Sequence, residues 1–388
     1  MRIWRYNFLI MLCLIASTPF LFAAENSNSS DVSNDKLWPV KINDEWGYID
    51  KNGKMIIKPQ QFDDAHAFSE GLAIIEVDGK KGYIDTTGKV IIKPQFEEAG
   101  AFSDGLAAVK IGDKFGYIER TGKVAIQPEY DLTLTFSEGL GLVKINDLYG
   151  YIDKTGKFVF KPEFKYAHRF SEGLASVTKN GEICFIDHKG IIVIRLKVDF
   201  AYNFIDGLAC VRQGGPHNGK WGFIDKSGRV VIPCIYFEVD NFSDGLAEIR
   251  VNENDKYGFI DKSGKMVIEP IYDSAGDFSE GFTIVRSKSA NVYGIIDKTG
   301  KMIVNTDNPE YLFHFTGGLI IFNKNDYWGF MDHTGRVIIE ARFQEAKDLD
   351  NTEPLQESID GAVMEQDMGP FLKILEQAVK EMKKENDN

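Results

Sequence analysis

The chain has 388 residues and a formal net charge of −13, because 58 Asp and Glu residues outnumber 45 Lys and Arg residues. An excess of negative charge disfavours nucleic acids and anionic membrane surfaces as partners. Beyond the first two dozen residues, no stretch is long and apolar enough to span a bilayer, so the mature chain is not predicted to be an integral membrane protein.

Residues 1–24 have the layout of a secretory signal peptide. Two arginines precede an apolar run at 8–16, and a polar segment follows residue 24. We therefore expect the protein to be secreted or to reside in the periplasm or cell envelope. An uncleaved anchor is the alternative, because a large residue stands three positions before either cut that would follow an alanine here. Residues 25–36 are rich in Asn, Ser and Asp and are predicted to form a flexible leader.

Residues 37–348 contain nine copies of one pattern, seen most clearly at 221–232 as two short strands joined by a turn. The copies recur every 34 to 38 residues, which is the signature of a repeat architecture. The residue after the first aromatic position of each copy is Gly47, Gly82, Gly116, Gly150, Cys184, Gly222, Gly258, Gly294 or Gly329.

Each unit predicts an apolar strand, a tight turn, the aromatic-glycine strand, a second turn, and a further strand that ends at a proline. A return segment ending in Phe-Ser-Glu-Gly or a close variant then leads to the next unit. The second turn carries a glycine in all nine units, which predicts a left-handed conformation there. The second-turn glycines are Gly53, Gly88, Gly122, Gly156, Gly190, Gly228, Gly264, Gly300 and Gly335. The Asp three residues before this glycine is predicted to accept backbone hydrogen bonds from the turn.

A unit of about 34 residues has too little core to fold alone, so neighbouring units must stack and share one. The predicted fold is all-β, a propeller-like ring of short antiparallel blades. An open solenoid of β-hairpins is the alternative, because nine units exceed the usual four to eight blades.

The pattern ends before the last forty residues. Residues 349–369 are acidic and poor in large apolar side chains, so they are predicted to be a linker. In residues 370–388, apolar side chains from Phe371 to Met382 fall at helical spacing, which predicts an amphipathic helix followed by a short tail. The helix would either cap an open array or contact a partner.

A Lys-Trp-Gly-Tyr-Ile-Asp-Lys-x-Gly-Lys pattern, followed by Phe-Ser-Glu-Gly-Leu-Ala, resembles the WG repeat, also called the KWG repeat, of many bacterial proteins. The resemblance covers residues 37 to about 345. It implies an all-β repeat domain of bacterial origin, commonly exported, and implies no shared activity. The chain departs from the pattern at Lys81, at 183–185 and at 305–315.

Three cysteines remain after the predicted signal peptide, and each replaces an ordinary structural residue of its unit. Cys184, Cys210 and Cys234 are predicted to be small buried thiols, with one disulfide between two of them as the alternative. No Cys-x-x-Cys or paired His motif accompanies them, so no metal site is expected.

No residue set indicates a reaction, so the protein is predicted not to be an enzyme and to need no cofactor. An acid or glycine repeated in every unit is architectural, whereas an active site needs residues that break the repeat. The six histidines are scattered, and no Gly-x-Ser-x-Gly, His-Glu-x-x-His or phosphate-binding glycine loop occurs.

The candidate binding site lies where the first hairpin turn is enlarged in units 6, 7 and 8. Equivalent loops of stacked units project from one face, so three consecutive enlargements predict a contiguous raised patch for a protein or peptide partner. Its candidate residues are Gln213, Pro216, His217, Asn218, Lys220, Asn252, Glu253, Asn254, Ser287, Lys288 and Asn291. The function predicted is that of an exported, noncatalytic interaction scaffold.

Glycan binding at the cell envelope is the alternative function. It would use the aromatic residues of the repeats, since stacking on a sugar ring requires an exposed aromatic face. The candidates are Trp46, Trp221 and Trp328.

Overall fold

The computed structural model describes residues 36–215, 218–287, 292–306 and 315–349. All of these residues belong to one compact unit. The predicted signal peptide, most of the leader, and the predicted acidic linker and C-terminal helix lie outside the described residues, apart from the linker's first residue. Within the described part of the chain, all regular secondary structure is β-strand.

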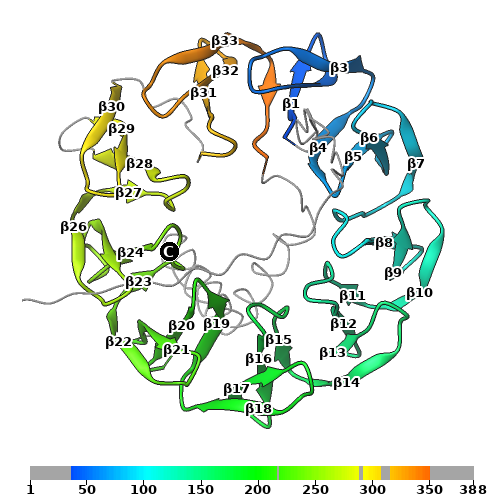
Figure 1. Cartoon of the computed structure of the whole chain (residues 1–388). Helices are drawn as coiled ribbons and strands as arrows, with labels where there is room; N and C mark the ends of the chain where they lie inside the picture. The colour runs from blue at the N-terminus through cyan, green and yellow to red at the C-terminus, as the bar shows by residue number, and fades with distance from the viewer. Residues whose placement is uncertain (1–35, 216–217, 288–291, 307–314, 350–388) are drawn as a thin grey trace, which may run out of the picture. The chain divides into compact units, whose positions relative to one another are not determined.

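The strands form nine small antiparallel sheets, which are the blades of a propeller (Figure 1). The innermost strands are β34 (Glu345–Ala346), β4 (Asp64–Ser69), β11 (Leu132–Thr133), β15 (Tyr166–Ala167), β19 (Phe200–Ile205), β23 (Glu238–Val239) and β27 (Ser274–Ala275). The second strands are β1 (Trp38–Ile42), β5 (Leu72–Val77), β8 (Leu106–Ile111), β12 (Gly141–Ile145), β16 (Leu174–Lys179), β20 (Leu208–Gln213), β24 (Leu246–Arg250), β28 (Phe282–Ser287) and β31 (Ile320–Lys324).

The third strands carry the aromatic-glycine motif. They are β2 (Glu45–Ile49), β6 (Lys80–Asp85), β9 (Lys114–Glu119), β13 (Leu148–Ile152), β17 (Glu182–Asp187), β21 (Lys220–Asp225), β25 (Tyr257–Asp261), β29 (Val292–Asp297) and β32 (Tyr327–Met331). The outermost strands are β3 (Met55–Gln60), β7 (Val90–Phe96), β10 (Val124–Tyr130), β14 (Phe158–Phe164), β18 (Ile192–Leu196), β22 (Val230–Tyr236), β26 (Met266–Tyr272), β30 (Met302–Thr306) and β33 (Val337–Phe343).

Blade 1 joins the two ends of the described chain, so the ring is closed. Its sheet has the order β3-β2-β1-β34, and β34 comes from the C-terminal end of the repeats. The backbone N–H groups of Gln344 and Lys347 donate to the carbonyls of Lys41 and Pro39, at 2.9 and 3.1 Å. The prediction of a propeller-like ring is confirmed, and the open solenoid alternative is wrong, because closure pairs an edge that a solenoid would leave exposed.

Sequence units and blades are offset by one strand. The return segment that ends a sequence unit supplies the innermost strand of the following blade, as β4 does for the sheet β4-β5-β6-β7. Blade 2 therefore holds β4 to β7, and the later blades follow in chain order. This offset is why the first blade takes its innermost strand from the far end of the repeats.

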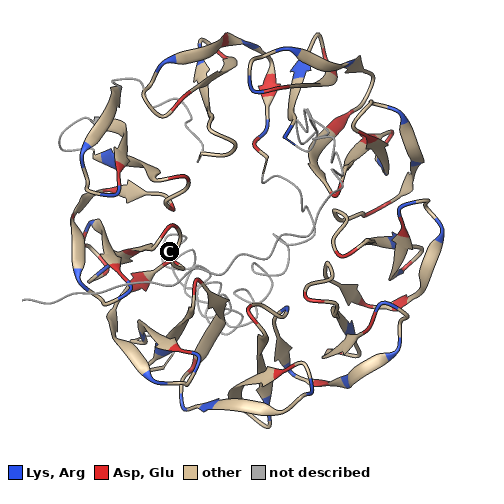
Figure 2. Ribbon diagram, in the orientation of Figure 1, with Lys and Arg blue, Asp and Glu red and all other residues tan. Residues whose placement is uncertain are grey.

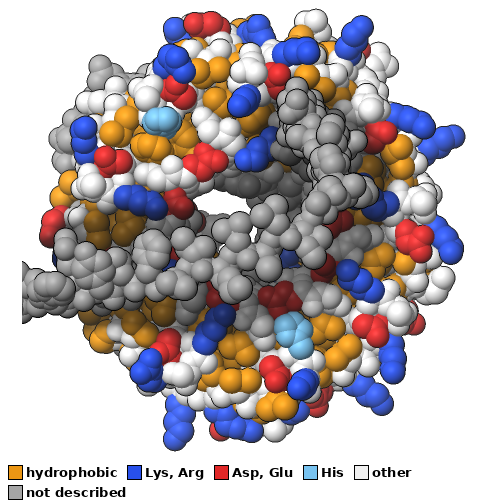
Figure 3. All heavy atoms as spheres, viewed as in Figure 1, with side chains coloured by type: hydrophobic (Ala, Val, Ile, Leu, Met, Phe, Trp, Pro, Cys, Tyr) orange, Lys and Arg blue, Asp and Glu red, His pale blue; other side chains and the backbone are white. Residues whose placement is uncertain are grey.

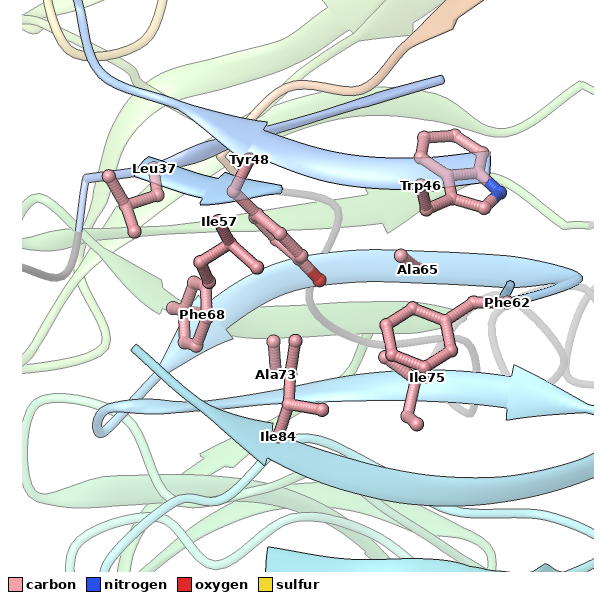
Figure 4. Close-up of a cluster of buried hydrophobic side chains, with 10 residues drawn as sticks. All are labelled: Leu37, Trp46, Tyr48, Ile57, Phe62, Ala65, Phe68, Ala73, Ile75 and Ile84. Carbon is pink, nitrogen blue, oxygen red and sulfur yellow. The ribbon is translucent and has the colours of Figure 1, made fainter. Parts of the chain in front are cut away.

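The hydrophobic core lies between blades. The aromatic residue after the motif glycine packs against the phenylalanine of the next return segment, as Tyr48 does against Phe68 with ring centroids 4.9 Å apart. Figure 4 shows this contact between blades 1 and 2, with Ile57 beside it and with Trp46, Phe62 and Ile75 further along the same cluster. The same pairing recurs down to Phe259 and Phe278 at 4.8 Å, so each blade completes the core of its neighbour.

Second-turn glycines fit against the preceding blade. All nine have φ between 74° and 84°, as their position in a three-residue hairpin loop predicts. A Cβ placed on Gly228 would lie 2.8 Å from Cγ2 of Ile194 on the outermost strand of blade 5. Gly53 faces Ile339 in the same way, which continues the contact through the closure. The preceding Asp accepts the expected backbone hydrogen bonds, for example from Ser227 and Arg229 to Asp225 at 2.9 and 3.1 Å.

The two ends of each sheet form different faces of the ring. The Phe-Ser-Glu-Gly turns and the second turns lie at one end, which we term the joint face. There the Ser69 hydroxyl donates to the Phe102 carbonyl at 2.8 Å, and the Gly105 N–H donates to the Glu70 carboxylate at 3.0 Å. Equivalent bonds recur between later blades. The turns between second and third strands lie at the opposite end, which we term the first-turn face.

The prolines expected to end the strands lie within the outermost strands instead. Pro94 stands inside β7, where the edge position leaves no partner for a missing N–H. A register shift there brings the Pro94 nitrogen within 2.6 Å of the place a Cβ on Gly82 would occupy, so only glycine fits. In blade 5 the shift at this point is absent, and Cys184 pairs directly with Arg195.

We predict that the second-turn glycine is required for both conformation and packing. Gly245→Ala, in a return-segment turn at φ 82° with open space around it, should cost about 1–2 kcal/mol for the left-handed backbone alone. Gly228→Ala, in a second turn at φ 79°, should cost at least about 1 kcal/mol more because Ile194 must move. Denaturant unfolding of both variants measures the difference; equal losses would contradict the packing role.

Ring closure predicts a sharp boundary for C-terminal truncation. A chain ending at Phe343 should lose roughly 2–4 kcal/mol of unfolding free energy, because the pairing of β34 with β1, its flanking backbone hydrogen bonds and the apolar contact of Leu349 are removed. A chain ending at Leu349 is the matched control and should unfold like the full chain. Equal stability of the two truncated chains would show that β34 does not stabilise the ring.

Candidate functional site

The described parts of the enlarged loops of blades 6 and 7 follow second strands and therefore share the first-turn face. In blade 6, Gln213 and Lys220 are the last paired residues of β20 and β21, so the loop proper is 214–219. Asn218 belongs to this loop, whereas Pro216 and His217 lie outside the described residues. Most of the blade 8 loop, including Lys288 and Asn291, also lies outside them.

The loops of blades 6 and 7 adjoin each other. Lys220 extends its ammonium group to the carbonyl of Val251 at 3.2 Å, next to the loop 252–256. That loop is braced internally, because the Asn252 side-chain amide donates to the Asp255 carboxylate at 2.8 Å. The side chains of Asn252, Glu253 and Asn254 are exposed. The described parts of the two loops therefore form one continuous polar surface.

Two candidate residues are less accessible than the sequence suggested. Ser287 is 7% exposed, so its assignment to an exposed binding loop is wrong: its side chain is enclosed at the end of β28. Trp46 is 0% exposed and its indole N–H donates to the Asp63 carbonyl at 3.2 Å. It therefore cannot offer a face to a sugar, since packing between blades 1 and 2 covers it. Trp221 and Trp328 are half-buried.

Trp221 belongs to an aromatic cluster that the sequence pattern did not indicate. Tyr202 stacks on Trp221 with centroids 5.6 Å apart and planes inclined by 20°, and Phe200 contacts Tyr202 at 4.8 Å. The Arg212 guanidinium lies over the Trp221 ring at 5.5 Å. All four side chains are half-buried.

A cavity of about 450 Å³ opens beside this cluster, between blades 5 and 6. Blade 5 contributes Tyr166, His168 and Thr178, and blade 6 contributes Phe200 and Arg212. The cavity lies toward the first-turn face and adjoins the enlarged loop of blade 6: Asp199, on its wall, accepts a hydrogen bond from the Gly215 N–H at 2.7 Å. Its size is that of a small-molecule or side-chain pocket.

A second cavity of about 450 Å³ lies along the innermost strands of blades 4 to 6. Its polar side chains bond to one another across the blades. Arg169 donates to the Thr135 hydroxyl at 2.6 Å, and the Asn203 amide donates to the Arg169 carbonyl at 2.8 Å. These groups hydrogen-bond neighbouring blades to each other along the innermost strands, so they are already engaged and are less available to a ligand than those of the first cavity.

Glu248 departs from the repeat, and its carboxyl group has a strongly raised pKa. Burial raises its pKa to about 8, and the negative charges of Asp240, Asp277 and Glu238 act in the same direction, with Arg250 opposing them. The adjoining cavity, of about 30 Å³, has room for about one water molecule and none for a substrate. The sequence does indicate this residue, because Glu248 is an acid within the apolar strand segment Leu246-Ala-Glu-Ile249.

The three cysteines are free thiols in the structure, and two of them, Cys184 and Cys210, are buried. Cys234 is half-buried, so the expectation of buried thiols holds for two of the three. Burial raises the pKa of all three thiols, which makes them poor nucleophiles. Within the described residues no group of three or more His, Cys, Asp or Glu side chains is arranged to hold a metal ion.

Charge alone does not mark out a binding surface. Lys and Arg lie mainly toward the outside of the ring, as Figure 2 shows. On the face seen in Figure 3, side chains of both signs are intermixed. Many are paired across the joint face, as Lys226 is with Glu172 at 3.0 Å and Lys262 with Asp206 at 2.6 Å. No helix long and apolar enough to span a membrane occurs among the described residues.

Glu248 predicts a pH-dependent stability. The pKa is about 8 in the folded protein against 4.5 ordinarily, so the folded state holds the proton more tightly. Stability should therefore fall as the pH rises from about 4.5 to about 8. Glu248→Gln removes this titration and should raise the melting temperature at pH 8 but not at pH 4. The exposed Glu253→Gln is the control; identical pH profiles for the two variants would contradict the assignment.

The model of the family described as WG containing repeat matches nine consecutive segments of the chain. The segments are 46–80, 82–115, 115–149, 149–182, 185–215, 221–254, 257–288, 293–328 and 328–351. No curated protein matches the chain.

Solved structures show only distant similarity. BamB from Moraxella catarrhalis is 12% identical, with 78% of this chain and 92% of that chain covered at a TM-score of 0.39. Apo AztD from Citrobacter koseri is 11% identical, with 82% and 95% covered at a TM-score of 0.37. Hsv2p from Kluyveromyces lactis is 9% identical, with 64% and 96% covered at a TM-score of 0.38.

Proposed function

The chain belongs to the WG repeat family, and we propose on that premise that it is an exported, noncatalytic scaffold whose first-turn face binds a protein or peptide. The observation that carries the proposal is the continuous polar surface formed by the described parts of loop 214–219 and by loop 252–256, linked by Lys220. Loops held on a rigid scaffold commonly carry binding function.

Several features support a noncatalytic role. The acids repeated in the Phe-Ser-Glu-Gly and second turns are engaged in backbone hydrogen bonds, as Glu70 and Asp225 are. The raised pKa of Glu248 arises beside a cavity too small for a substrate. The buried thiols of Cys184 and Cys210 have raised pKa values and are correspondingly unreactive.

Export is supported by the amino-terminal sequence alone. The arginine-flanked apolar run and the polar segment after residue 24 have the order of a secretory signal. Glycan binding would now depend on Trp221 and Trp328, because Trp46 is enclosed. At Trp221 the neighbouring Tyr202 and Arg212 already occupy ring surface, which favours the protein or peptide partner.

We predict that trimming the blade 6 loop removes partner binding without unfolding the ring. Replacing 214–219 by Asn-Gly keeps the paired residues Gln213 and Lys220 and gives the two-residue turn found in blades 1 to 5. Affinity capture from an envelope extract of the source organism, quantified by mass spectrometry, should show a loss of about tenfold or more in the partner bound.

Lys154→Ser on the joint face is the matched control, since it alters a charged surface residue away from the loops. Circular dichroism and the melting temperature verify that both variants are folded. If the folded, trimmed protein recovers every partner of the intact protein in the same amount, the first-turn loops are not the binding site.

A further inference from the structure

Arg212 has no acidic residue opposite it on the innermost strand, whereas Lys110 and Arg250, at the same position in blades 3 and 7, do. Lys144 and Arg286 face Leu132 and Ser274, so they too lack an acid there, but only Arg212 among these lines a described cavity. In blade 7 the residue paired across the first two strands is Glu238, and its carboxylate lies 2.5 Å from Arg250. In blade 3, Glu98 pairs with Lys110 at 2.9 Å in the same place. Opposite Arg212 the paired residue is Phe200, which carries no charge.

The Arg212 guanidinium is therefore a cation whose carboxylate partner is missing. Its Nε is buried and makes no hydrogen bond, as is also true of the Arg250 Nε in the pair with Glu238. The Arg212 Cζ lies 5.5 Å from the centroid of the Trp221 ring, and the loop residue Gly219 packs against its stem. A carboxylate placed in the cavity would give the Arg212 guanidinium the charge partner that Arg250 has in Glu238.

The cavity between blades 5 and 6 places apolar rings and a second cation near Arg212. Tyr166 and Phe200 supply apolar ring surface, and Lys165, whose ammonium lies 5.5 Å from the centroid of the Tyr166 ring, adds a second positive charge. Asp199 is the one carboxylate on the described wall, and it is engaged by the Gly215 N–H at 2.7 Å. His168 completes the titratable groups of the lining.

We propose that this cavity binds a carboxylate attached to a flat or apolar group. The carboxylate would take the place that Glu98 and Glu238 hold in blades 3 and 7, forming a charge-assisted pair with Arg212. The attached group would pack on Phe200 and Tyr166. A free aromatic acid and the carboxyl terminus of a peptide both have this chemistry. The inference stands apart from the proposed loop surface, because it rests on the cavity and on Arg212.

The test uses ligand-observed NMR titration of the full chain with two pairs of probes. Phenylacetate and phenylacetamide differ in charge and little in shape, and N-acetylphenylalanine and N-acetylphenylalaninamide form the peptide pair. Each carboxylate should bind at least about tenfold more tightly than its amide, as expected for a hydrogen-bonded charge pair. Tighter binding of phenylacetate points to a free acid, and tighter binding of N-acetylphenylalanine points to a peptide terminus.

Three variants locate the site. Arg212→Gln should abolish the preference for carboxylates. Arg286→Gln should leave it unchanged: Arg286 holds the same position in blade 8, lies 5.1 Å from the Tyr293 ring centroid and lines none of the described cavities. Phe200→Glu should also abolish binding, because it supplies the internal carboxylate of blades 3 and 7.

Melting temperatures show whether each variant is folded. If Phe200→Glu does not fold, the comparison of Arg212→Gln with Arg286→Gln still tests the proposal. Equal binding of acids and amides would overturn the proposal. So would an unchanged preference in Arg212→Gln, or the absence of detectable binding up to the solubility limit of the probes.

Discussion

Burial of aromatic side chains between successive blades is the interaction on which this fold depends. A single blade of four short strands cannot cover its own apolar face, so Tyr48 completes its packing on Phe68 of the next blade. The second-turn glycine allows this close approach, as the contact of Gly228 with Ile194 shows. Closure by β34 gives the first blade the same support as the others.

The same requirement explains why most repeated polar residues are unavailable for function. The Phe-Ser-Glu-Gly acid accepts a hydrogen bond from the next blade, and does so in an uncommon backbone conformation, with φ of 48° at Glu70. The second-turn Asp holds its own hairpin. Binding chemistry must then come from residues that depart from the repeat, and these gather in blades 5 to 7.

Blade 6 combines several such departures. Ile205 stands where other blades carry the serine whose hydroxyl donates to a carbonyl of the next blade, as Ser171 does to Phe204. Phe200 replaces the acid opposite Arg212, and the loop 214–219 exceeds the usual two-residue turn. The cavity walled by Tyr166 and Phe200 adjoins this loop. The first-turn face around blades 5 to 7 is therefore chemically distinct from the rest of the ring.

The sequence by itself determined the nine units, their strands and both turn types, because glycine, Asp-Gly and Asn-Asp positions fix the local backbone. It also located the enlarged loops, since turn length is a local property. Ring closure was decided only by tertiary structure, because the pairing of β34 with β1 joins residues some 300 positions apart. The same holds for the enclosure of Trp46 and Ser287, the burial of Glu248 and the missing partner of Arg212. Each depends on which side chains of a neighbouring strand or blade lie opposite, and one unit read alone does not contain that information.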